Sequence, residues 1–122
     1  MLTEDFCSYE VAKLLKEKGF DTFKPYGWDE ELFDKEHPRN FSLGFDSKEH
    51  WISCPTHQMA MKWLRKVHNQ HVQINYLHGA YQEFDYVVIN TFNGKAYHEP
   101  VSFSTYEEAV EVAIKYCLEN LI

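Results

Sequence analysis

A cysteine and three histidines in the middle of the chain have the spacing of metal ligands. Cys54 and His57 form a Cys-x2-His pair, and His68 and His71 form a His-x2-His pair. The residues between the pairs have the apolar pattern of a helix, which would hold His57 roughly 16 Å from His68. The ligands of one zinc ion lie only about 4 Å apart. We therefore expect no metal site from these four residues and no cofactor, although a nonspecific surface site at the last two histidines stays open.

Cys54 also occupies a position typical of a nucleophile. It precedes the predicted helix, whose N-terminal N–H groups and dipole lower a thiol pKa, and His57 follows one turn later. The opposing interpretation is that Cys54 ends a strand as a small buried residue, which is the commoner fate of a free cysteine. No motif supplies an oxyanion hole or a third, orienting residue. We therefore expect no catalytic residue and no enzyme, with a cysteine-dependent enzyme ranked last.

The same segment carries the positive charge of the chain. No acidic residue occurs between Glu49 and Glu83, although the net charge of the whole chain is −7. A basic helix over 55–69 could contact phosphates, so weak nucleic-acid binding is the alternative function. The net charge disfavours it, and contact with acidic segments of the same fold is the simpler explanation. The basic side chains are Lys62, Arg65 and Lys66, followed by His68.

Three helices should position these residues. The first begins after Ser8, a typical N-cap residue, and ends where Gly19 fits the left-handed C′ position and Phe20 can fold back on Leu15. The second, over 55–69, opens with a proline at its first position. Its predicted apolar stripe consists of Met59, Ala60, Trp63, Leu64 and Val67.

The third helix opens with a capping box at Thr105–Glu108 and continues to the end of the sequence. Its polar stripe is narrow, so we expect the helix to lie between a sheet and another element. The residues of that polar stripe are Glu108, Glu111, Lys115 and Glu119.

The second half of the chain predicts an antiparallel meander. After Asn69 the apolar period changes from 3.6 to 2, and "HVQINYLH" at 71–78 is typical of a strand. "FDYVVINTF" at 84–92 has apolar residues on both faces, as a central strand does. Asn93-Gly94 predicts a two-residue type I′ hairpin turn, and "KAYHE" at 95–99 then returns as an edge strand.

The segment between the first two helices is less regular. Residues 21–40 are expected to be mostly irregular and packed by their own aromatic side chains, with a short helix near Asp29–Phe33. "FSLGF" at 41–45 alternates like a half-buried strand and is expected to pair with "HWIS" at 50–53. The sequence therefore predicts a single α+β domain over 1–122: a three-stranded antiparallel meander, with room for one or two further strands, packed against three helices.

Composition limits the cellular setting. The N-terminus lacks the positive and apolar regions of a signal peptide, and no apolar run approaches the ~20 residues of a membrane span. Three cysteines at positions 7, 54 and 117 are an odd number and do not form a disulfide framework. We expect a cytoplasmic protein that does not contact a membrane.

Three segments carry a resemblance to known sequences. "SYEVAKLLKEKGFD", "PTHQMAMKWLRKVHN" and "TYEEAVEVAIKYCLENLI" resemble segments of a family of small uncharacterised proteins from gut bacteria and their bacteriophages. The resemblance covers about a third of the chain, lies in the helices and brings no activity, cofactor or site residue with it. It implies only a phage or prophage setting and an intracellular location.

We expect from these features a non-enzymatic protein-interaction domain. Its partner would be another protein, from host or phage. We expect it to bind through the aromatic 23–51 region and the neighbouring basic helix, because Trp, Tyr and Arg dominate binding hot spots. Trp28, Trp51 and Arg65 would be the first residues to replace by alanine. The oligomeric state is left open, a homodimer included.

Overall fold

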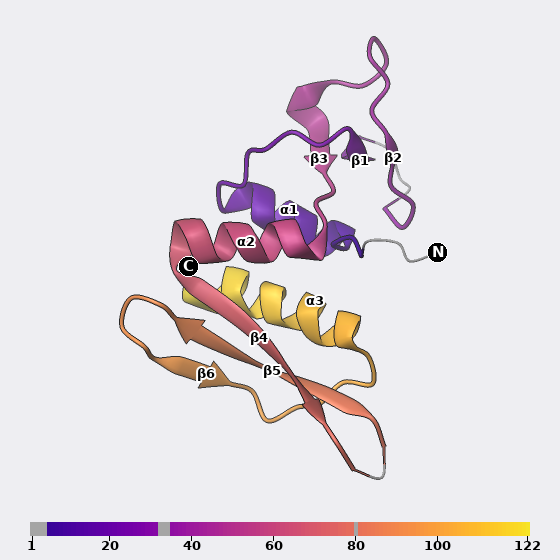
Figure 1. The fold of residues 1–122 in the computed structure, drawn as a ribbon. Coiled ribbons are helices and arrows are strands. Elements are labelled where there is room, and N and C mark those ends of the chain that lie inside the picture. Colours follow the sequence, from indigo (N-terminus) through magenta and orange to yellow (C-terminus); the bar gives the residue numbers. More distant parts are fainter. Residues whose placement is uncertain (1–4, 32–34, 80) are drawn as a thin grey trace. The chain divides into compact units, whose positions relative to one another are not determined.

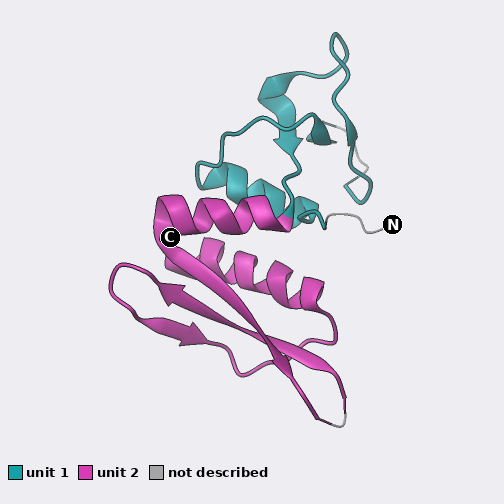
Figure 2. Cartoon of the chain, in the orientation of Figure 1, with its two compact units in different colours: residues 1–56 teal, residues 57–122 magenta. Residues whose placement is uncertain are grey.

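The computed structural model describes residues 5–31, 35–79 and 81–122. Contacts within the chain divide it into two compact units, residues 1–56 and 57–122 (Figure 2). The described residues form three α-helices and two three-stranded antiparallel sheets, which confirms the α+β class (Figure 1). The single domain expected over 1–122 stays a prediction.

Unit 1 begins with helix α1, Tyr9–Glu17, and both of its ends are capped as the sequence predicts. The hydroxyl oxygen of Ser8 accepts a hydrogen bond from the Val11 N–H at 3.3 Å. At the other end Gly19 has a φ of +102°, and the Phe20 N–H donates to the Leu15 carbonyl at 2.9 Å. This is a Schellman motif, which satisfies carbonyls that the helix leaves without a partner.

Three short strands follow in unit 1. Strand β1, Tyr26–Asp29, lies between β2, Arg39–Asn40, and β3, Trp51–Ser53, and a short 3-10 turn, η1 at Lys48–His50, precedes β3. Helix α1 packs against β3. The prediction of a strand near 50–53 is confirmed, but its partner is β1, within the stretch that was expected to be mostly irregular.

Residues 41–45 do not form the predicted strand. The N–H groups of Phe45 and Asp46 both donate to the Ser42 carbonyl, so the chain turns there, with Gly44 at a φ of +88°. The alternation of apolar and small residues therefore marks a turn with outward-facing apolar side chains. The helix predicted near Asp29–Phe33 falls partly on residues 32–34, outside the described residues, and Asp29 itself ends β1.

Unit 2 opens with helix α2, His57–His68, two residues later than predicted. Its buried side differs from the predicted stripe, because Met59 and Val67 are exposed. Only Ala60 and Leu64 of that stripe are buried, and Trp63 is half-buried. The buried residues of α2 are His57, Ala60, Met61 and Leu64.

The predicted meander is confirmed in unit 2. Strand β5, Glu83–Asn90, lies between β4, Gln70–Leu77, and the shorter edge strand β6, Ala96–His98. The hairpin at Asn93-Gly94 is also confirmed, but its turn is not type I′. Such a turn needs positive φ at both residues, and of these two only Gly94 has it, at +75°. The loop is longer, and the Asn90 N–H donates to the Lys95 carbonyl across it.

Helix α3, Tyr106–Tyr116, continues into a wider π-type turn, η2 at Cys117–Leu121. The Thr105 hydroxyl accepts from the Glu108 N–H at 3.1 Å, while the Glu108 carboxylate accepts from Ser104, so half of the predicted capping box forms. Figure 1 shows α3 between the sheet and α2, and it contacts β4, β5 and α2, which confirms the predicted sandwich. In the part of the chain described here, no helix has the length and apolar character to cross a membrane.

Candidate functional site

The two tryptophans that were expected to contact a partner are core residues of unit 1. Trp28 and Trp51 are each 3% exposed. The Trp51 indole N–H donates to the Lys24 carbonyl at 2.8 Å, and the Trp28 ring packs edge-on against Tyr9 with centroids 5.5 Å apart. This burial corrects their assignment as surface anchors, because a side chain enclosed in the core offers no area to a partner.

The predicted basic residues lie on α2, in unit 2. Lys62 and Lys66 are exposed one helical turn apart, and Arg65 is half-buried between them in sequence. His68 ends the helix, and its ring packs edge-on against Trp63 with centroids 4.6 Å apart. These residues form a small positive surface, here called the basic side of α2, with two exposed charges.

Cys54 is a buried residue, as predicted by the interpretation that it is a small residue at the end of a strand. It is 2% exposed, and its thiol donates to the Cys7 carbonyl at 3.5 Å. Cys54 and the other cysteines are free of disulfides. Burial also raises the pKa of the Cys117 thiol to about 12, so that thiol stays protonated at neutral pH.

Helix α2 is continuous from His57 to His68, which places these two histidines at its opposite ends. They cannot share one metal ion, because eleven helical residues rise by roughly 16 Å. His57 instead bonds through its Nε2 to the Glu111 carboxylate of α3 at 2.6 Å. No sequence pattern predicted this pair, since the two residues are 54 positions apart and Glu111 belongs to an ordinary polar stripe.

A second surface was missed by the sequence analysis: residues 39–46, here called the 39–46 loop. A bidentate ion pair closes it, in which the Arg39 guanidinium donates to the two carboxylate oxygens of Asp46 at 2.8 and 2.6 Å. The Ser42 N–H donates to the same carboxylate at 2.7 Å. Paired parallel hydrogen bonds of this kind fix orientation as well as distance.

The ion pair shifts the protonation of both partners. Hydrogen bonding to the Arg39 guanidinium holds the pKa of the Asp46 carboxyl well below its usual range, and the Ser42 N–H acts in the same direction. The same hydrogen bond raises the pKa of Arg39. Both groups are therefore charged at neutral pH, and the loop stays closed.

The closed loop presents two apolar side chains to solvent. Leu43 is 91% exposed and Phe45 is 73% exposed. Behind them, Phe41 packs edge-on against Trp51 and Phe23, with centroids 5.2 and 5.3 Å apart. The loop is thus tied to the core of unit 1 while its tip stays free.

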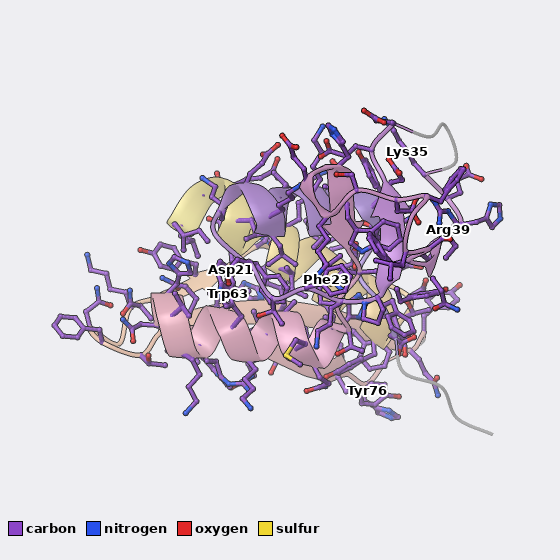
Figure 3. All side chains as sticks on the ribbon, turned by 90° about the horizontal axis from the view of Figure 1, so that it is seen from above. Asp21, Phe23, Lys35, Arg39, Trp63 and Tyr76 are labelled. Atoms are coloured by element: carbon purple, nitrogen blue, oxygen red, sulfur yellow. The ribbon has the colours of Figure 1, made fainter. Side chains whose placement is uncertain are left out.

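Arg39 contacts both the buried Trp51 ring and the exposed Phe45 ring at the tip of the loop. Its guanidinium lies 5.5 Å from the centre of the Trp51 ring and 6.0 Å from that of Phe45. Figure 3 labels Arg39 and Phe23 among the side chains of unit 1. The turn residues Ser42, Gly44 and Asp46 were the sequence signal for this loop, and the apolar alternation concealed it.

Comparison of the chain with protein-family models, curated proteins and solved structures found no match. Two surfaces of the described residues can therefore be weighed by their geometry, the 39–46 loop in unit 1 and the basic side of α2 in unit 2.

Proposed function

We propose that the chain is a non-enzymatic protein-interaction domain that binds its partner through the 39–46 loop. The observation that supports this proposal is the high exposure of Leu43 and Phe45 on a loop closed by the Arg39–Asp46 ion pair. Large apolar side chains held away from the core expose area that gains free energy when a partner covers it, about 1.5–3 kcal/mol for each fully buried side chain.

The closed loop also favours tight binding. Association costs free energy when loops and side chains become ordered in the interface. The hydrogen bonds from Arg39 and Ser42 to Asp46 order the backbone before any partner arrives. Phenylalanine and arginine are both enriched at protein–protein interfaces.

The net charge of unit 1 and its exposed apolar side chains indicate which kind of partner would bind. Unit 1 contains seven basic and twelve acidic residues, a net charge of −5. A partner with an apolar pocket surrounded by basic residues would fit the loop and be attracted by that charge. The resemblance of the helices to phage-encoded proteins makes a host or phage protein our proposed partner, and the three free cysteines are in keeping with a cytoplasmic setting.

A photo-crosslinking amino acid at position 45 tests the proposal in cells that make the protein. We expect a discrete adduct with one protein, and we expect Leu43→Ser in the same chain to reduce it strongly. The matched control carries the same crosslinker at Phe92, which is 88% exposed on the β5–β6 loop of unit 2. Equal adducts from both positions, or none from position 45, would overturn the proposal.

Weak nucleic-acid binding by α2 is the second candidate, and the exposure of Lys62 and Lys66 one turn apart favours it. Such binding depends on phosphate neutralisation and falls steeply with added salt. A low-salt gel-shift series with single- and double-stranded oligonucleotides tests it. A complex that persists unchanged in Lys62→Gln/Lys66→Gln, or no complex at all, rules this candidate out.

A further inference from the structure

Unit 1 contains a pocket of about 450 Å³, which lies between the C-terminal half of α1 and the beginning of β3. We propose that it binds a small organic monoanion, a carboxylate attached to an aromatic or branched apolar body. Pockets of roughly 300–1,000 Å³ with an apolar lining and a few polar groups are typical small-molecule sites. Leu43 and Phe45 do not line it, so the pocket is a different surface from the proposed protein contact, although its lining residues Phe23 and Trp51 also pack against Phe41 of the 39–46 loop.

The floor of the pocket is apolar and fixed. Ala12, Phe20 and Trp51 line it and are all buried in unit 1. The Schellman motif at the end of α1 holds the Phe20 backbone, and the hydrogen bond to the Lys24 carbonyl holds the Trp51 ring. These three side chains each expose 6% of their area or less, so an apolar body would gain most of its apolar contact from the Phe23 ring, which also lines the pocket and is 41% exposed.

Two lysines, Lys16 and Lys48, line the pocket. The Lys16 ammonium donates to the carbonyls of Glu49 and Trp51, both at 3.3 Å, which fixes its place beside the floor. The Lys48 ammonium lies 4.8 Å from the centre of the Phe23 ring. Both lysines line the pocket and are otherwise exposed, so an anion can reach them from solvent.

The remaining charges limit the ligand to a single negative charge. Asp21, labelled with Phe23 in Figure 3, lines the pocket from the segment after α1 and partly offsets the two lysines. The adjoining end of α1 is its C-terminus, where the helix dipole is negative. None of the described residues that line the pocket is an arginine, the residue best suited to bind phosphate with two hydrogen bonds. Lysine binds phosphate as a point charge, so the preference rests on the charge balance: two lysines and one aspartate match a single carboxylate better than a multiply charged phosphate.

The test is an amide-shift NMR titration of the full chain with 2-naphthoate, compared with 2-naphthalenemethanol. These probes share the ring system and differ in charge. We expect saturable shifts from 2-naphthoate in residues 12–23 and 48–53, and binding of the neutral alcohol weaker by about 5-fold or more.

Lys48→Gln supplies the matched variant, because this exposed side chain supports no backbone hydrogen bond among those described. We expect its affinity for 2-naphthoate to fall about 2- to 5-fold and its affinity for the alcohol to stay unchanged. Lys95→Gln removes an exposed lysine of unit 2 and is expected to change neither affinity.

Three results would overturn the proposal. They are equal affinity for the two probes, shifts that lie mainly outside the pocket, and no saturable shift up to about 5 mM probe, which would mean binding too weak for a specific site. Unchanged 2-naphthoate affinity in Lys48→Gln would likewise refute the role of charge, and the amide spectrum of each variant reports directly whether it is folded.

Discussion

The Trp51 side chain contacts two separate segments of unit 1, the chain at Lys24 and the 39–46 loop. Its indole N–H bonds to Lys24, Phe41 packs edge-on against its ring, and the Arg39 guanidinium lies over the same ring. Tryptophan is enriched both in binding hot spots and in cores, because its large apolar area serves either role. Only the pairing of β3 with a strand more than twenty residues away decides between them, and residue type cannot reveal that pairing.

Substitutions at buried and exposed positions of unit 1 should differ sharply in their effect on stability. We expect Trp51→Ala to lower the free energy of unfolding by about 3–5 kcal/mol, because it leaves a cavity in the core. We expect Leu43→Ser/Phe45→Ser to change it by no more than about 1 kcal/mol, because both side chains already face solvent. Denaturant unfolding followed by circular dichroism measures both. A stable Trp51→Ala protein would contradict the core position of this residue.

The Arg39–Asp46 ion pair should make a contribution to stability that disappears in acid. The pKa of Asp46 lies below its ordinary value of 3.8, so the folded state holds the ionised carboxylate more strongly than the unfolded state. The contribution is therefore fully present above that ordinary value and is lost as the pH falls through the lower, folded-state pKa.

Melting temperatures of the wild type and Asp46→Asn between about pH 7 and pH 2 test this contribution. We expect the wild type to melt higher at neutral pH and the difference to narrow below about pH 4, the region of the ordinary carboxyl pKa. Arg39 stays charged over the whole range, because its pKa is raised. A difference that is absent at neutral pH, or constant into acid, would contradict the prediction.

At the scale of elements, helices and the meander were predictable because their signals are local. Ser8 and Gly19 mark the two ends of α1 within a few residues, and β4 and β5 alternate beside a hairpin turn. The sequence did not determine which face of α2 is buried. Ala60 and Leu64 belong to two possible apolar stripes, one with Met59 and one with Met61. The choice between Met59 and Met61 depends on neighbours that are distant in sequence.

The sheet of unit 1 could not be predicted, because its strands are short and pair across long loops. Strand β1 has four residues, includes Gly27 and follows a proline, so it lacks a usual strand signal. The 39–46 loop was missed for a related reason. Its apolar residues alternate as in a strand, and the contact that closes it joins Arg39 and Asp46, seven positions apart, a pairing that this alternation does not indicate.

Gly27 is the residue that this sheet can least replace. A Cβ atom there would overlap the carbonyl oxygen of Ile52 and lie 3.1 Å from the backbone nitrogen of Cys54. Both atoms belong to the backbone of the paired strand region, which cannot move aside as a side chain can. We expect Gly27→Ala to lower the free energy of unfolding by about 1–3 kcal/mol.

Gly79→Ala is the control, because nothing lies within 4 Å of a Cβ atom at that position and its φ is ordinary. Its effect should stay within about 0.5 kcal/mol. Thermal or denaturant unfolding compares the two variants. Equal stability for Gly27→Ala and Gly79→Ala would show that β1 and β3 do not approach as closely as described.

At the scale of the molecule, unit 2 has the requirements of an independent fold. It contains three strands and two helices that contact one another, and it carries only a small net charge of −2 from five basic and seven acidic residues. In the full chain, the largest wholly buried side chains of unit 2 are Leu64, Tyr86, Val88, Val110, Ile114, Cys117 and Leu118. Domains of 55–65 residues do fold alone, with modest stability.

We therefore expect the fragment 57–122 to fold when it is made without unit 1. Dispersed amide NMR signals and a cooperative melting transition would show this, and a parallel fragment 1–56 serves as comparison. If 57–122 is unfolded while the full chain melts in one step, the single domain expected from the sequence is supported instead. If both fragments fold, the chain consists of two domains.

The placement of the tryptophans has a practical consequence. Trp28 and Trp51 are enclosed in unit 1, whereas Trp63 lies half-buried on α2 of unit 2. In Trp63→Phe all indole fluorescence comes from unit 1, and its emission should move to longer wavelength when water reaches those rings. In this variant Trp28 and Trp51 thus report on the opening of unit 1 by their own fluorescence, without any attached dye.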